Sequence, residues 1–200
     1  MDVLVGITGY KGAGKDIVGS AFTDLGFETV KFADCLKGML SWMLVYRGAP
    51  MDDVERMIEG DLKETPTPYF EGKTPREAMQ WLGTEWGRDL IGPDVWKNAF
   101  KDAALSRSLV VCTDMRFPNE NNLIKELGGY RIRVTRPDKQ PNEFSLHESE
   151  AYITSMEVDY EITNDATIEQ LKSAANIAAA NISDSAIYDT MRWDQNNEGC

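Results

Sequence analysis

The sequence predicts an α/β fold in three layers, with helices on both faces of a central parallel sheet of about five strands. Val3–Thr8 is apolar on both of its faces, as expected of a central strand in a parallel sheet. A glycine-rich turn and a helical pattern follow it, and a second strand at 29–32 leads into another helical pattern. A further apolar strand at 108–113 ends in Asp114. Strands that alternate with helices in this way are typical of a doubly wound sheet.

The composition predicts one soluble globular domain that works on small molecules. The chain has 200 residues, of which 42% are hydrophobic and 27% charged, so it can bury a core of ordinary size. The net charge of -12 argues against a nucleic-acid duplex or an anionic membrane as partner. No apolar run in the sequence approaches the length that a membrane span needs, and we expect no secretion signal. Three widely spaced cysteines predict a reducing, cytoplasmic location.

The glycine-rich turn has the spacing of a phosphate-binding loop. Residues 9–16 read GYKGAGKD, which matches G-x-x-x-x-G-K-[ST] except that Asp16 replaces the hydroxyl residue. A glycine turn between a strand and a helix directs backbone N–H groups and the positive end of the helix dipole at one spot. Lys15 adds a point charge within reach of the β- and γ-phosphates. We therefore expect a nucleoside triphosphate to bind here.

The next elements follow from apolar spacing. The first helix should end near Gly26, and a second should begin after 34. Its expected buried face is Leu36, Met39, Leu40, Met43 and Leu44. Prolines and glycines then interrupt the pattern over 47–73, around one short acidic helix at about 52–59. This stretch is predicted to be an excursion from the sheet.

A well-marked helix start follows the excursion. Thr74 is a suitable N-cap, Pro75 suits the first helical position, and Glu77 completes a capping box. A single helix is expected to continue through Trp86, and another to carry Trp96.

One stripe of that helix is unusual. Arg76, Gln80, Gly83 and Gly87 fall on one side at about 100° per residue. Two glycines there cost on the order of 1 kcal/mol each relative to alanine, so a ligand or another helix should approach closely.

The last third of the chain supplies the other edge of the sheet. Strands are predicted at 130–134 and 160–163. A helix should follow, starting with a second capping box from Thr167 to Gln170 and running to about 182. Its expected inward residues are Ile168, Leu171, Ala175 and Ile182. The polar, acidic tail at 183–200 is expected to be flexible.

Several stretches together resemble a known family. They read GYKGAGKD, FADCLK, KTPREAMQWLGTEWGRDLIGPDVW, TDMRFPNE and ITND, and the likeness covers about residues 3 to 180. The chain resembles the deoxynucleoside monophosphate kinases encoded by tailed bacteriophages. The resemblance implies a P-loop NTPase fold, ATP and Mg²⁺ as cofactors, and transfer of the γ-phosphoryl group of ATP to a deoxynucleoside 5′-monophosphate. It also implies host cytoplasm as the location.

The resemblance also implies how the chain is divided. Residues 1–182 would form one kinase domain, in which about 47–106 is a helical acceptor-binding region and about 136–150 a lid-like loop. His147, within that loop, is expected to be a surface residue and no catalyst. Two positions depart from the family pattern: Gly12, where a basic residue is frequent, and Ile17, where a threonine is frequent. Both departures put more weight on Lys11, Lys15 and Asp16.

Candidate site residues follow from the loop and the resemblance. The expected catalytic set is Lys15, Arg76, Arg116 and Arg136. The expected ATP-binding set is Lys11, Gly12, Ala13, Gly14, Lys15, Asp16, Ile17, Asn164 and Asp165. The expected acceptor-binding set is Asp34, Arg76, Gln80, Gly83, Arg88, Trp96, Asp114 and Arg116. Asp16 and Asp114 are the candidate metal ligands, since a carboxylate at the end of a central strand beside a phosphate loop is suited to organise Mg²⁺.

Other interpretations stay open from the sequence. Each arginine can instead be one half of a surface ion pair, and Trp96 can be an ordinary core residue. The runner-up enzyme is another small-metabolite kinase of the same fold, such as a phosphomevalonate or dephospho-coenzyme A kinase. A non-catalytic ATP-binding regulatory protein is the alternative from a different class. Whether the chain forms a homodimer is left open.

Overall fold

The computed structural model describes the backbone of residues 1–139 and 152–197, and the side chains of 1–138 and 152–185. The chain folds into two compact units, Met1–Lys31 with Lys101–Cys200, and Phe32–Phe100. The second unit therefore begins ahead of the predicted excursion at 47 and takes in the second helix. Among the described residues, no helix is long and apolar enough to cross a membrane.

The first unit is built on a five-stranded parallel sheet, as predicted. Its strands are β1 (Val3–Thr8), β2 (Glu28–Thr29), β3 (Leu109–Cys112), β4 (Tyr130–Thr135) and β5 (Tyr160–Thr163). They lie in the order β2-β3-β1-β4-β5, and every pairing is parallel. All six residues of β1 are buried, which agrees with its central place in the sheet.

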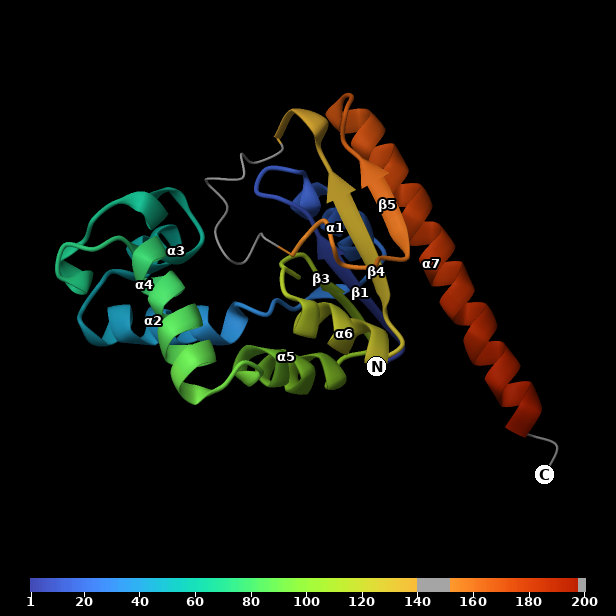
Figure 1. The fold of residues 1–200 in the computed structure, drawn as a ribbon, viewed down its shortest axis with the longest axis horizontal. Helices are drawn as coiled ribbons and strands as arrows, with labels where there is room; N and C mark the ends of the chain where they lie inside the picture. Colours follow the sequence, from blue (N-terminus) through green and yellow to red (C-terminus); the bar gives the residue numbers. More distant parts are fainter. Residues whose placement is uncertain (140–151, 198–200) are drawn as a thin grey trace. The chain divides into compact units, whose positions relative to one another are not determined.

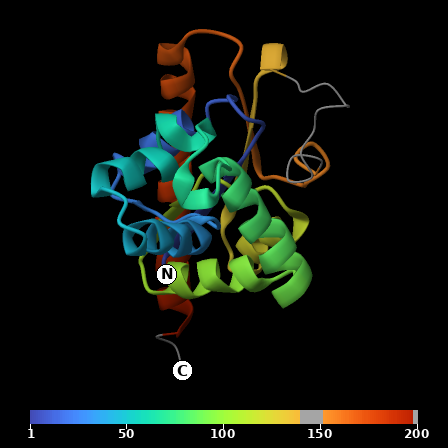
Figure 2. The same cartoon turned by 90° about the vertical axis from the view of Figure 1, so that its left-hand side faces the viewer.

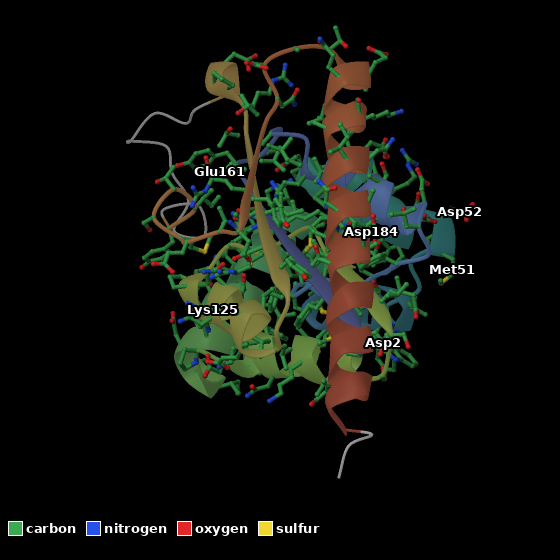
Figure 3. The ribbon with its side chains drawn as sticks, turned by 90° about the vertical axis from the view of Figure 1, so that its right-hand side faces the viewer. Asp2, Met51, Asp52, Lys125, Glu161 and Asp184 are labelled. Atoms are coloured by element: carbon green, nitrogen blue, oxygen red, sulfur yellow. The ribbon has the colours of Figure 1, made fainter. Side chains whose placement is uncertain are left out.

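Helices cover both faces of this sheet. They are α1 (Lys15–Thr23), α6 (Pro118–Glu126) and α7 (Ile168–Asn197), while α5 (Val95–Leu105) contributes residues to both units. Val5 and Ile7 of β1 join the apolar cluster formed with α1 and α7. The opposite face carries α6, because a Cβ on Gly6 would meet Ile124 at 3.0 Å. Figure 1 shows the strands with α7 running along the sheet, and Figure 3 shows α7 in front of the strands.

A buried arginine of β4 forms a bidentate ion pair with the residue just before β5. Arg131 of β4 is buried and donates from Nε and one terminal nitrogen to the two carboxylate oxygens of Asp159, at 2.9 and 2.8 Å. The backbone N–H of Arg131 donates to the same carboxylate, and the N–H of Asp159 donates to the carbonyl of Arg131. These hydrogen bonds hold the pKa of Asp159 below its usual value.

The second unit consists of helices and turns, without a strand in residues 32–100, all of which are described (Figure 2). Its helices are α2 (Asp34–Tyr46), α3 (Met51–Ile58) and α4 (Pro75–Trp81), with 3₁₀ turns η1 (Asp61–Glu64) and η2 (Pro68–Phe70) between them. A separate apolar core holds it together, made of Leu40, Leu44, Ala49, Val54, Met57, Ile58 and Phe70. The capping box predicted at Thr74 is confirmed by reciprocal hydrogen bonds with Glu77.

The predicted single helix through Trp86 is wrong in one respect. α4 ends at Trp81, and η3 (Leu82–Ile91) is a π-helix. π-Helical turns are rare and frequently occur at functional sites. The constant 100° step therefore does not extend through the predicted stripe.

Other boundaries and faces also differ from prediction. β2 has only two residues, although the N–H of Val30 still bonds to Val111. Met39 and Met43 are 40% and 43% exposed, and Ile168 is 57% exposed, so these three were wrongly predicted as inward. The capping box at Thr167 is confirmed by its hydrogen bonds with Gln170. The last helix continues to Asn197 instead of ending near 182.

Candidate active site

The phosphate-binding loop joins β1 to α1, and its glycines are required by its shape. Gly9, Gly12 and Gly14 have φ values of +151°, +79° and +105°. A Cβ on Gly9 would come within 2.4 Å of the carbonyl oxygen of Val134, and one on Gly14 within 2.8 Å of Leu171. Gly14 is also the N-cap of α1 in a left-handed conformation. Only glycine allows the chain to turn here without strain.

The loop presents the amino end of α1 as an anion site. The first-turn N–H groups of a helix have no acceptor within the helix, and the helix dipole adds positive potential there. α1 begins at Lys15, directly after the loop. Around Gly12 the space is open, since a Cβ there would have no atom within 4 Å. Phosphate oxygens can therefore approach the backbone at this point.

Lys15 is held over the loop by backbone carbonyls. Its ammonium donates to the carbonyl oxygens of Gly9 at 2.7 Å and Tyr10 at 2.9 Å. These contacts hold the positive charge of Lys15 against the backbone of the loop. Lys11 is exposed, whereas Ile17 is half-buried and packs against the apolar core. The departure at Ile17 therefore adds to packing and offers no polar group to a ligand.

Asn164, of the predicted ATP-binding set, lies against the loop. Its side-chain amide donates to the carbonyl of Ala13 at 2.9 Å, and its backbone N–H donates to Thr135. Asp165 is exposed beside it. The end of β5 is thereby fastened to the phosphate-binding loop across 151 residues of sequence.

Asp16 makes the contact that the sequence reasoning missed. One of its carboxylate oxygens, Oδ1, accepts a hydrogen bond from the hydroxyl of Thr113 at 3.1 Å, and the ammonium of Lys31 lies 4.0 Å away. The Asp16 side chain is 87% exposed, so the carboxylate is open to a ligand. The sequence did offer a signal for this contact, because Thr113 stands next to Asp114 at the end of β3. Nothing in the sequence indicated that Lys31 would lie near Asp16.

Asp114 follows β3, where the prediction placed it. Its side chain is half-buried and accepts a hydrogen bond from the thiol of Cys112 at 3.2 Å. Burial, and then the charge of Asp114, raise the pKa of the Cys112 thiol well above its usual value. In the residues that the structure describes there is no cluster of three or more metal-ligating side chains.

The loop that carries Arg116 is organised by a buried carboxylate. Glu120 is 2% exposed and accepts hydrogen bonds from the backbone N–H groups of Arg116 at 2.7 Å and Phe117 at 3.1 Å. Pro118 opens α6, and Glu120 stands at its third position, which is a capping signal readable in the sequence. Sequence reasoning missed Glu120 as a support for Arg116.

The acceptor candidates on the second unit make contacts of their own. Arg76 donates to the carboxylate of Glu64 in a partly exposed ion pair. Arg88 donates to the carbonyl oxygen of Pro93 at 3.3 Å. Gln80 is exposed on α4, and Asp34 is exposed in the first turn of α2.

Trp96 is a core residue, which corrects its prediction as an aromatic surface for a ligand. It is 3% exposed, and its indole N–H donates to the carbonyl oxygen of Gly83 at 2.8 Å. A Cβ on Gly87 would lie 2.5 Å from the indole ring. Gly87 therefore makes room for the tryptophan, which is the packing alternative left open by the sequence, whereas a Cβ on Gly83 would make only an ordinary contact with Leu36 at 3.5 Å.

Arg136 forms an ion pair with Asp138 at 2.9 Å. The rest of the predicted lid-like loop, including His147, lies largely outside the described residues.

Comparison with known proteins gives a consistent family. A model of the family "Deoxynucleotide monophosphate kinase" matches residues 51–175. A putative deoxynucleotide monophosphate kinase of Acanthamoeba polyphaga mimivirus is 34% identical over 190 residues, covering 86% of this chain and 93% of that protein. The deoxynucleoside-5′-monophosphate kinase of Escherichia phage T5 is 29% identical over 98 residues, covering 46% of this chain and 39% of that protein.

Solved structures that resemble this chain have a lower sequence identity than these relatives. Dephospho-CoA kinase from Campylobacter jejuni is 15% identical and has a TM-score of 0.45, covering 90% of this chain and 96% of that one.

Proposed function

Because this chain belongs to the deoxynucleotide monophosphate kinase family, we propose that it transfers the γ-phosphoryl group of ATP to a deoxynucleoside 5′-monophosphate. The bond between the γ-phosphorus and the β,γ-bridging oxygen breaks, and a bond forms to an oxygen of the acceptor phosphate. The products are ADP and a deoxynucleoside diphosphate. The observation that carries the proposal is a phosphate-binding loop of the required geometry in a chain of this family.

The donor half of the site is the loop and the residues fastened to it. We propose that N–H groups of the segment from Gly12 to Asp16 hold the ATP phosphates, and that Lys15 reaches the γ-phosphate. Asn164 and Asp165, at the end of β5, would flank the adenine, and Lys11 would add charge from the exposed side of the loop.

The residues present fit Mg²⁺. The Asp16 carboxylate is exposed beside the loop, and Asp114 stands at the end of β3. Mg²⁺ is usually held by one or two carboxylates together with substrate phosphates and water. When bound, the ion neutralises charge on the β- and γ-phosphates. We propose Asp16 as the principal protein ligand, with Asp114 as the second candidate.

The acceptor half would use arginines. A phosphate dianion is bound best by planar bidentate donors, and we propose Arg76 for this role, supported by Arg88 and Arg116. Arg76 would exchange Glu64 for the acceptor phosphate. Such an exchange is inexpensive, because partly exposed ion pairs contribute about 0–1 kcal/mol. Arg136 would approach the transferring group. The acceptor is already an anion, so a general base is unnecessary.

The remaining proposals concern the location of the protein and its binding partners. The relatives are from a virus and a phage, which supports host cytoplasm as the place of action. The partners are small molecules, ATP and the nucleotide, and we propose no nucleic-acid or membrane partner, on the ground of the net charge.

The experiment is coupled ADP release with ATP, Mg²⁺ and each deoxynucleoside monophosphate in turn. Ribonucleoside monophosphates and dephospho-coenzyme A serve as comparison acceptors. We expect ADP release above the acceptor-free background with at least one deoxynucleotide, and the diphosphate as product by chromatography. ATP binding without transfer to any acceptor would contradict the proposal and favour a regulatory ATP-binding protein.

A further inference from the structure

The contact between Thr113 and Asp16 joins residue types that differ from those of the general phosphate-binding pattern. In the general pattern the loop supplies a hydroxyl to Mg²⁺, and the neighbouring strand supplies a carboxylate. Here the loop helix supplies the carboxylate of Asp16, and the residue that follows β3 supplies the hydroxyl of Thr113. A carboxylate can only accept hydrogen bonds, and at the end of the strand the Thr113 hydroxyl is the donor.

The packing around Thr113 fixes its side chain. Thr113 is 6% exposed, and its methyl group faces Gly19 of α1 so closely that a Cβ on Gly19 would lie 2.5 Å away. Glycine inside a helix is less favourable than alanine. At this position it lets the strand end approach the helix. The threonine is therefore inserted between strand and helix, with its hydroxyl directed at Asp16.

We propose that Thr113 is a positioning residue for the Asp16 carboxylate. Both neighbours, the Thr113 hydroxyl at 3.1 Å and the Lys31 ammonium at 4.0 Å, contact the same oxygen, Oδ1. Holding one oxygen fixes the direction of the other, on a side chain that is 87% exposed. A carboxylate oriented in advance binds a cation better than a freely rotating one, as outer-shell hydrogen bonds do for other metal ligands. The inference rests on the proposed function, because it assigns Asp16 to Mg²⁺.

The test measures metal binding directly. Mn²⁺, which replaces Mg²⁺ and is seen by electron paramagnetic resonance, is titrated into the full chain with ADP present. Thr113→Val keeps the shape and removes the hydroxyl, and we expect Mn²⁺ affinity to fall about tenfold. Thr113→Ser restores the hydroxyl and should bind Mn²⁺ within about twofold of the unchanged protein. Thr23→Val, at the far end of α1, removes an exposed hydroxyl and is the matched control with unchanged affinity.

A double-mutant cycle separates positioning from general damage. In Asp16→Asn the negative charge is gone, so adding Thr113→Val should cause little further loss of Mn²⁺ affinity. Full additivity of the two losses would overturn the proposal, as would wild-type affinity in Thr113→Val. Thermal unfolding without ligand identifies any variant that fails to fold; if Thr113→Val does so, Thr113→Ala, which also lacks the hydroxyl, takes its place and should show the same loss of Mn²⁺ affinity. If the unchanged protein binds Mn²⁺ with ADP but transfers no phosphoryl group to any acceptor, the proposed function is wrong while the role of Thr113 is still tested by the Mn²⁺ affinities.

Discussion

Lys15 is the residue on which phosphoryl transfer should depend most. Its ammonium is fixed by the carbonyls of Gly9 and Tyr10, so its charge is already in place when the phosphates arrive. Lys15→Met keeps most of the length of the side chain and removes the charge. We expect the turnover rate to fall by about 10²–10³ or more, as when a single transition-state donor is removed. A steady-state assay of ADP release measures this.

The control for that variant is Lys172→Met, which removes an exposed lysine of α7 in the same unit. Its rate should equal that of the unchanged protein. Retained transfer by Lys15→Met would contradict the role of the lysine.

Gly87 carries a prediction about stability. Gly87→Ala places a Cβ 2.5 Å from the Trp96 ring, which is buried and cannot move away without disturbing the core. Overpacking of this kind costs about 1–3 kcal/mol. Thermal or urea unfolding should show a loss in this range.

Gly38→Ala is the matched control, since Gly38 lies in α2 and a Cβ there meets no atom within 4 Å. Alanine is the better helix former, so this variant should be stabilised by up to about 1 kcal/mol. Equal stability of the two variants would show that Trp96 does not occupy the space beside Gly87.

At the scale of elements, α6 is built around a carboxylate that faces its own start. Glu120 is buried and accepts the N–H groups of Arg116 and Phe117. Glu120→Ala leaves two backbone donors with a lost partner, at a cost of about 1–3 kcal/mol. We expect that loss in urea unfolding, together with faster hydrogen exchange at the N–H groups of Arg116 and Phe117.

Glu126→Ala is the control in the same helix, because Glu126 is exposed at the other end of α6. It should change stability by less than about 0.5 kcal/mol. Unchanged exchange at Arg116 in Glu120→Ala would contradict the support that we assign to Glu120.

Elements with strong local signals were predictable from the sequence. β1 was found with its bounds because a run of apolar residues ended at a glycine loop, and α4 was found because Thr74, Pro75 and Glu77 form a complete start signal. The phosphate-binding loop was found for the same reason, as its glycines meet local backbone requirements.

Features set by tertiary contact were not predictable. The π-helix after Trp81 accommodates Trp96, which lies outside the stretch that the periodicity describes. Met39 and Met43 continue the apolar spacing of α2 yet remain exposed, because spacing alone does not tell how wide a buried face is. The Thr113–Asp16 hydrogen bond joins residues 97 positions apart, and spacing within either segment does not reveal it.

At the scale of the whole molecule, the pair Arg131–Asp159 predicts how stability depends on pH. The pKa of Asp159 is lowered on folding, so its contribution is complete above its unfolded value of about 4 and is lost as pH falls through the folded value. Removing the pair with Asp159→Asn leaves the buried Arg131 guanidinium without its charge partner. We expect a loss of about 2 kcal/mol at pH 7, reduced from the figure for fully buried pairs because Asp159 is partly exposed.

Urea unfolding at pH 7 and pH 3 tests the sign. The difference between Asp159→Asn and the unchanged protein should shrink on going to pH 3, where the carboxyl begins to protonate. Asp184→Asn, which removes an exposed carboxylate of α7, should show no such change. A constant difference at both pH values would contradict the assignment.

The raised pKa of Cys112 has a practical consequence for observing the enzyme at work. A thiol that is buried and kept protonated reacts slowly with alkylating reagents, whereas Cys35 is exposed on the unit of residues 32–100. Once Cys200 is replaced by serine, a maleimide dye should attach at Cys35 alone. Fluorescence from that single position would then report on the unit of residues 32–100 in real time as nucleotides are added and removed, with the sheet and its phosphate loop chemically untouched.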